Sequence, residues 1–220
     1  MGRYFEENYS MLKHKLVEMS ATVQQLVSSS IKSLRENNLQ LAHETIQDDE
    51  RVDRLEVEID ELVLKLLALQ QPMAIDLRFL ITALKINNDL ERMGDQATNV
   101  AQNVVLMQSV DLESVNTDVD FQQMEAAVQV MVQQTIDAFT TGNVDLAREV
   151  IKGDDLVDEL NKRIIDKLVK HMRENSADAD ICVALLLITR NLERIGDLCT
   201  NIAEDVIYYI EGKIIKHTYA

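Results

Sequence analysis

Hydrophobic residues recur along most of this chain at alternating spacings of three and four residues, with polar residues between them. This spacing places the apolar side chains on one face of an α-helix. In the first half it predicts three helices, one from Tyr4 to Arg35, one of about 30 residues that begins after Asn38, and one from about Ala74 to Val104. In the second half it predicts three more, over about 118–140, 144–173 and 177–212. Asn38 and Asn143 each precede a helical run and suit the N-cap position, where a side-chain oxygen accepts a backbone N–H.

Residues that interrupt helices are rare, with one Pro and six Gly among 220 residues. The apolar share of 46% beside an aromatic share of 4% favours helices over a β-rich fold. Long helices joined by short turns must pack antiparallel to their neighbours. The polar stretch 109–117 separates the two sets of helices and is the candidate linker. We therefore predict an all-α fold of two tandem, duplicated antiparallel three-helix bundles, over residues 1–110 and 116–220.

The two halves share a twelve-residue motif, LERMGDQATNVA at 90–101 and LERIGDLCTNIA at 192–203. Eight of the twelve positions are identical, and several of these are polar. A duplicated fold needs only matching apolar positions, so matching carboxylates indicate a duplicated site. Gly94 and Gly196 sit mid-helix in the two copies, at a cost of about 1 kcal/mol each relative to Ala. Close approach of either a neighbouring helix or an ion cluster would explain them.

Each half carries two pairs of carboxylates spaced four residues apart, which places both members of a pair on one helix face. The pairs are Asp49 with Asp53, Glu91 with Asp95, Asp154 with Asp158, and Glu193 with Asp197, and Asn99 and Asn201 each follow one turn later. Within each half the two pairs lie on consecutive antiparallel helices at similar distances from the turn. We therefore expect them to face each other and to form one acidic set in each half.

Oxygen-only ligands of this kind suit hard cations such as Mg²⁺, Mn²⁺ or iron, with more than one ion sharing the carboxylates. The Glu-x-x-His pattern of di-iron bundle sites is absent, because no His has a Glu three residues before it. An alternative is that arginines neutralise the acidic faces as ordinary solvated ion pairs. That alternative pairs Arg92 with Asp95, Arg194 with Asp197 and Arg190 with Glu193.

Acidic residues outnumber basic ones by 38 to 22, which gives a formal net charge of −16. That charge repels phosphate backbones and anionic membrane surfaces, so we expect no direct binding to nucleic acid or lipid. No apolar run approaches the roughly 18 residues that a membrane span needs, and the N-terminal residues lack the pattern of an export signal. Cys182 and Cys199 fall on one predicted helix about 25 Å apart, too far for a disulfide. We therefore expect a reduced, cytoplasmic protein.

At its four acidic pairs the chain resembles the PhoU family, whose members are regulators associated with the bacterial phosphate-specific transporter. The resemblance covers essentially the whole length, since all four E(D)xxxD motifs occur in order on six predicted helices. It implies that the paired motifs bind multinuclear clusters of metal ions, with iron, zinc, magnesium or manganese as the metal. It also implies a regulator with no catalytic or organic-cofactor residue.

The resemblance further implies a role in signalling. Such proteins relay the state of the phosphate transporter to a membrane sensor histidine kinase, and they hold the phosphate-starvation response off when phosphate is plentiful. The implied partners are the ATPase subunit of the transporter and that kinase, so the protein would be peripheral to the membrane only through them. A homodimer is compatible with the sequence.

Two other functions remain as alternatives. A metal-dependent phosphohydrolase would need a nucleophile or base beside an open coordination position, and no Ser/His/Asp or Cys/His arrangement accompanies the acidic pairs. A plain helical adaptor would carry the same acidic faces as solvated surface, and chelation would change neither its stability nor its assembly.

Overall fold

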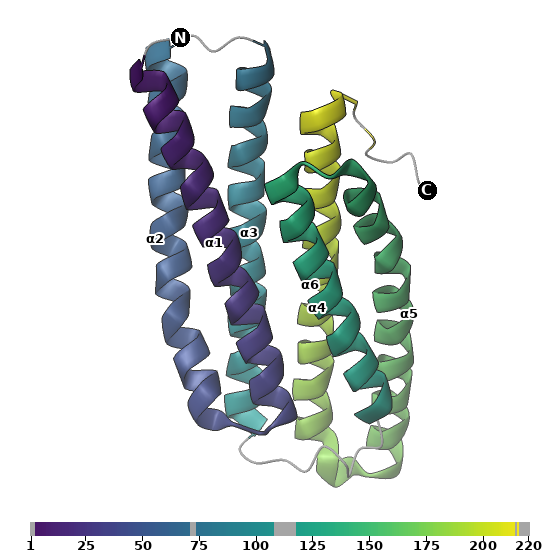
Figure 1. The fold of residues 1–220 in the computed structure, drawn as a ribbon. Coiled ribbons are helices and arrows are strands. Elements are labelled where there is room, and N and C mark those ends of the chain that lie inside the picture. Colours follow the sequence, from purple (N-terminus) through teal and green to yellow (C-terminus); the bar gives the residue numbers. More distant parts are fainter. Residues whose placement is uncertain (1–2, 71–73, 108–117, 214, 216–220) are drawn as a thin grey trace.

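The computed structural model describes residues 3–70, 74–107, 118–213 and 215. Within these ranges every regular element is helical and no strand occurs. The helices are α1 (Arg3–Arg35), α2 (Leu39–Gln70), α3 (Ala74–Met107), α4 (Asp118–Thr141), α5 (Val144–Glu174) and α6 (Ala179–Glu211), with a short 3-10 turn, η2 (Ser176–Asp178), before α6. Helices α1, α2 and α3 form one antiparallel bundle, and α4, α5 and α6 form a second one beside it (Figure 1). The predicted all-α fold of two duplicated three-helix bundles is confirmed.

The helix boundaries follow the predicted caps. The N–H of Leu41 donates to Asn38 Oδ1 at 3.0 Å, and the N–H of Leu146 donates to Asn143 Oδ1 at 3.1 Å. The last helix begins at Ala179 rather than at residue 177, because η2 takes up its expected first residues. The predicted linker 109–117 lies outside the described residues, so the boundaries at 110 and 116 stay a prediction.

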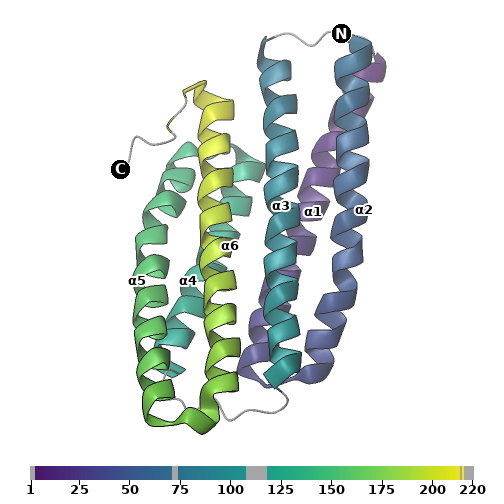
Figure 2. The ribbon, with the colours of Figure 1, turned by 180° about the vertical axis from the view of Figure 1, so that it is seen from behind.

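The two bundles share one continuous core because α3 and α6, the last helix of each, pack against each other (Figure 2). The apolar stripe predicted for α1 is buried, and Leu12, Leu16 and Met19 have no exposed surface. Helices α3 and α6 run antiparallel (Figure 2). A residue of α3 and its counterpart 102 positions later on α6 therefore lie on opposite sides of the middle of this contact.

An ion pair crosses the contact between α3 and α6 at one end. Lys85 Nζ of α3 lies 3.0 Å from Asp205 Oδ1 of α6, and the Asp205 side chain is only 3% exposed. The counterparts of these two residues at the other end are Leu187 and Asn103, which line a pocket of about 260 Å³ together with mostly apolar side chains. We call the contact between α3 and α6 the seam between the bundles. One end of the seam is closed by an ion pair, and the other end is lined by mostly apolar side chains.

Two further sequence predictions concern the cysteines and the membrane. Cys182 and Cys199 are free thiols buried on α6, which agrees with the predicted absence of a disulfide between them. Among the described helices, none combines the length and apolar character that crossing a bilayer requires.

Candidate metal centres

The first acidic set is built by α2 and α3. Asp49 and Asp53 project from α2, and Glu91 and Asp95 project from the neighbouring α3. Charge contacts link the two helices, since the Asp95 carboxylate raises the pKa of Asp49 and the Asp53 carboxylate raises the pKa of Asp95. The expectation that the two pairs face each other at similar height therefore agrees with the structure.

Partial burial and mutual repulsion raise the pKa values of carboxyl groups in this first set. Burial raises the pKa of Asp49 to about 6, and the charges of Asp53 and Asp95 contribute to this rise. Burial also raises the pKa of Glu91 to about 7, with Asp95 and then Glu56 as the strongest neighbouring charges. The carboxylates are therefore poorly compensated by the protein itself.

The second acidic set repeats this arrangement on α5 and α6. Burial raises the pKa of Asp154 to about 7, and the charges of Asp197, Asp158, Asp155 and Glu193 add to the effect. The pKa values of Glu193 and Asp197 are also raised, by burial first and then by neighbouring carboxylates. The sequence repeat has thus produced two electrostatically similar sites.

The arginine pairs of the alternative interpretation do not form among the described residues. Arg92 Nη1 lies 3.4 Å from Asp89 Oδ1 instead of pairing with Asp95. Among the described residues, neither Arg194 with Asp197 nor Arg190 with Glu193 comes within ion-pair distance. Both arginines lower the pKa values of Glu193 and Asp197 only through longer-range charge.

The two mid-helix glycines allow a carboxylate and a helix to approach at once. A Cβ atom on Gly94 would lie 3.1 Å from Asp49 Oδ1 and 3.4 Å from Val52 Cγ1. A Cβ atom on Gly196 would likewise lie 3.1 Å from Asp154 Oδ1. Close approach of a neighbouring helix therefore explains both glycines, and each glycine opens the space that one aspartate of its set occupies. Approach of an ion cluster stays a prediction.

Two buried side-chain oxygens in the second half are unsatisfied. Asp154 Oδ1 and Asn161 Oδ1 are buried without a hydrogen-bond partner, although such atoms ordinarily have one. As the side chains stand, no three His, Cys, Asp or Glu groups within the described residues converge closely enough to hold one ion. The donor set, its unmet oxygens and its raised pKa values nevertheless fit a hard cation bound by oxygen.

Sequence reasoning missed two members of these neighbourhoods. Glu56 lies three residues after Asp53 and raises the pKa of Glu91, and its counterpart at the 105-residue offset between α2 and α5 is the unsatisfied Asn161. Asp155 lies beside Asp154 and raises its pKa. Comparing the two halves beyond the ExxxD spacing would have found the Glu56–Asn161 pair.

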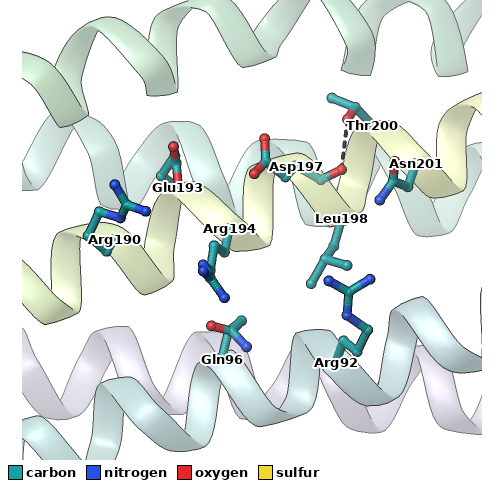
Figure 3. Close-up of a pocket in the computed structure, with 9 residues that line it drawn as sticks. All are labelled: Arg92, Gln96, Arg190, Glu193, Arg194, Asp197, Leu198, Thr200 and Asn201. Carbon is teal, nitrogen blue, oxygen red and sulfur yellow. Dashed lines mark hydrogen bonds between the residues drawn. The ribbon is translucent and has the colours of Figure 1, made fainter. Parts of the chain in front are cut away.

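The asparagines and threonines of the repeated motif lie near the acidic sets, and their contacts differ between the two halves. Asn99 is half-buried one turn beyond Asp95, and its backbone carbonyl accepts a hydrogen bond from Asn103 Nδ2 at 2.7 Å. Asn201 lines a groove between α3 and α6 (Figure 3). Thr200 Oγ1 donates to the Asp197 carbonyl at 2.7 Å, whereas Thr98 Oγ1 is buried without a hydrogen-bond partner.

The groove between α3 and α6 has a volume of about 470 Å³ and adjoins the second acidic set. Its lining residues are Arg92, Gln96, Arg190, Glu193, Arg194, Asp197, Leu198, Thr200 and Asn201. In Figure 3, Arg194 and Leu198 project from α6 toward α3, and Arg92 and Gln96 project from α3 toward α6. Basic and acidic side chains therefore share one opening.

The metal-free protein will lose stability as pH rises from about 5 to about 8. A carboxyl group whose pKa is higher in the folded than in the unfolded chain stabilises the fold while it is protonated, and this contribution disappears as pH passes through the folded pKa. Asp49, Glu91 and Asp154, with pKa values of about 6, 7 and 7, titrate in this window. After discounting for solvent screening, we expect a fall in Tm of roughly 5 °C in chelating buffer.

The matched control for this pH effect is the double variant Asp49→Asn and Asp154→Asn. Its Tm should change less across the same window, because two of the titrating groups are gone. A wild-type Tm that rises between pH 5 and pH 8 in chelator would contradict the electrostatic description of both sets.

Fold and site together define a duplicated helical-bundle protein with one acidic set in each half. The family model for the PhoU domain matches residues 16–104 and 121–206, and the chain belongs to the PhoU family. The phosphate-specific transport system accessory protein PhoU homolog 1 of Thermotoga maritima is 34% identical over 215 residues, covering 97% of this chain and 91% of that protein. The corresponding PhoU homolog of Clostridium acetobutylicum is 33% identical and covers 96% of each chain.

Solved structures give the same result. The crystal structure of PhoU from Pseudomonas aeruginosa matches with a TM-score of 0.90 and 32% identity, over 95% of this chain and all of that one. The phosphate transport system regulatory protein PhoU from Streptococcus pneumoniae matches with a TM-score of 0.85 over 96% of this chain and 99% of that one. At 23% identity, the second comparison supports the fold alone.

Proposed function

We propose that this protein is a non-catalytic, metal-binding accessory protein of the phosphate-specific transport system. In this proposal it works in the cytoplasm and links the ATPase subunit of the transporter to a sensor histidine kinase, so that the phosphate-starvation response stays off when phosphate is abundant. Membership of the PhoU family supports the transport role, because relatives at 33–34% identity carry the name of transport-system accessory proteins.

The single observation that carries the metal-binding role is the pair of uncompensated acidic sets. The ligands would be Asp49, Asp53, Glu91 and Asp95 with Asn99 in the first half, and Asp154, Asp158, Glu193 and Asp197 with Asn201 in the second. Bound iron, manganese, magnesium or zinc would supply the positive charge that these carboxylates lack. Gly94 and Gly196 keep open the space that Asp49 and Asp154 need.

Charge inversion at these sets would provide the switch. Without cations, each set repels the acidic side chains of a partner. With the carboxylates neutralised, the same surface accepts such side chains, so occupancy changes partner affinity. If all eight carboxylates are changed to their amides and binding to the ATPase subunit and the kinase is unaltered in metal-containing buffer, this switch is wrong.

Elemental analysis of protein purified without chelator tests the metal role directly. We expect wild type to carry metal, and a variant with Asp49→Asn, Asp53→Asn, Glu91→Gln and Asp95→Asn to lose about half of it. The matched control changes the exposed residues Glu6, Glu36, Glu44 and Glu61 to their amides, which removes the same charge elsewhere and should leave metal content unchanged. Metal-free wild type whose Tm does not respond to Mg²⁺, Mn²⁺ or iron would favour the plain helical adaptor.

A further inference from the structure

Two parallel stripes of opposite charge run along α6. Arg190, Arg194 and Leu198 follow each other at four-residue spacing, and Glu193 and Asp197 form the stripe next to them. In Figure 3 Arg194 and Leu198 point toward α3, whereas Glu193 and Asp197 point to the other side of α6. Arg194 therefore faces α3, whereas Arg190 lies beside Glu193 at the margin of the groove. Glu193 and Asp197 belong to the second acidic set and also line the groove.

A third arginine enters the same groove from the other bundle. Arg92 of α3 is the repeat counterpart of Arg194, and because α3 and α6 are antiparallel the two approach the seam from opposite helices (Figure 3). Arg190 has no basic counterpart, since the equivalent α3 residue is Asn88. The groove thus gathers three guanidinium groups in a chain whose formal net charge is −16.

Two of these three guanidinium groups, those of Arg190 and Arg194, take part in no hydrogen bond or ion pair among the described residues. Arg92 has one ion pair, to Asp89 at 3.4 Å, and its side chain is 54% exposed. Arginine side chains present N–H donors in a planar fork that matches the oxygens of an oxyanion. The groove therefore offers donors from two helices, and among the described residues no acceptor lies within hydrogen-bond or ion-pair distance of Arg190 or Arg194.

We propose that this groove binds inorganic phosphate between the two bundles, with Arg190, Arg194 and Arg92 as its ligands. A tetrahedral oxyanion can accept hydrogen bonds from several directions, which suits guanidinium groups that enter from opposite helices. A carboxylate is planar and is satisfied by one guanidinium fork. The volume of about 470 Å³ leaves phosphate and several waters room beside Gln96, Thr200 and Asn201, which offer further polar groups.

Phosphate binding is linked to the acidic set because Glu193 and Asp197 line the same groove. Their negative charge opposes an anion, and a cation held by the set removes that opposition. By reciprocity, phosphate then strengthens cation binding by the same factor. Only this linkage rests on the proposed metal role. It would make the occupancy of each site depend on the concentrations of both phosphate and metal.

Isothermal titration calorimetry with inorganic phosphate tests the proposal, in Mg²⁺ buffer and in chelator at pH 7.5. We expect one saturable site, weakened at least tenfold in the variant Arg190→Gln with Arg194→Gln, since charge-assisted hydrogen bonds to an anion are stronger than those that a neutral amide can make. Arg173→Gln, which removes an exposed arginine of α5, is the matched control and should bind as wild type does. Circular dichroism verifies that each variant stays helical.

Three results would overturn the proposal. The first is the absence of saturable phosphate binding to wild type in both buffers, and the second is equal binding by the double variant. A polyglutamate peptide is titrated in parallel, and tighter binding of that peptide at the same arginines would also overturn it in favour of a carboxylate-docking surface. Metal bound without phosphate rejects this inference alone, whereas phosphate bound by a protein that takes up no metal rejects the metal role alone.

Discussion

Replacing Lys85 with Leu will destabilise the protein by about 3 kcal/mol, because it leaves the Asp205 carboxylate buried and unpaired at the seam between the bundles. Lys85 Nζ lies 3.0 Å from Asp205 Oδ1, and the Asp205 side chain is 3% exposed. The same ammonium lies 5.6 Å from the centre of the Tyr208 ring, so the substitution also removes a cation–π contact. Urea denaturation followed by circular dichroism measures the change.

The chain itself supplies the control for this substitution. At the other end of the seam the repeat places Leu187 and Asn103 at the positions equivalent to Lys85 and Asp205. The double variant Lys85→Leu with Asp205→Asn copies that pair, and it should recover most of the lost stability because no buried charge remains. If Lys85→Leu alone costs less than about 1 kcal/mol, the Asp205 carboxylate does not depend on this partner.

The helices and the acidic sets could be predicted because their determinants are local. Apolar spacing, the Asn38 and Asn143 caps and the i, i+4 carboxylate pairs act within one or two turns. Counting residues from each pair to the intervening turn then predicted that the two pairs of the first half would lie at similar height on neighbouring helices. The internal repeat located the second set.

The arginines show where local reasoning fails. Spacing allows Arg92 to reach either Asp89 or Asp95, which lie three residues before and after it on the same helix. The structure pairs it with Asp89, which is largely buried, rather than with the exposed Asp95. Spacing along a helix therefore limits which carboxylates an arginine can reach, but it does not determine which one forms the ion pair.

The groove between α3 and α6 could not be predicted because it depends on how the two bundles pack. Periodicity assigns a buried face to each helix, but it does not give the antiparallel register in which Arg92 lies near Leu198 and Arg194 near Gln96 (Figure 3). That register is set by the packing of α3 against α6, where the cores of the two bundles join. The candidate phosphate ligands therefore emerged only from the three-dimensional arrangement.

Changing Gly94 or Gly196 to Ala will lower metal content by about half while leaving the fold at least as stable. The new Cβ atom would lie 3.1 Å from Asp49 Oδ1 in one half or from Asp154 Oδ1 in the other, so the carboxylate must move by a few tenths of an ångström and leave its position as a ligand. Alanine is favoured over glycine by about 1 kcal/mol in a helix. This gain in stability offsets the cost of crowding the aspartate side chain. Elemental analysis and thermal melts separate the two effects.

Gly153→Ala distinguishes loss of a ligand position from a general effect of alanine in a helix. Its Cβ atom would lie 3.5 Å from Met131 Cγ, an ordinary contact, so it should gain the same helical preference and keep its metal. The combined variant Gly94→Ala with Gly196→Ala should lose nearly all bound metal, because each glycine serves a separate set. If the combined variant keeps wild-type metal content, Asp49 and Asp154 are not ligands, and the glycines serve only the approach of Val52 and Val157 to the neighbouring helix.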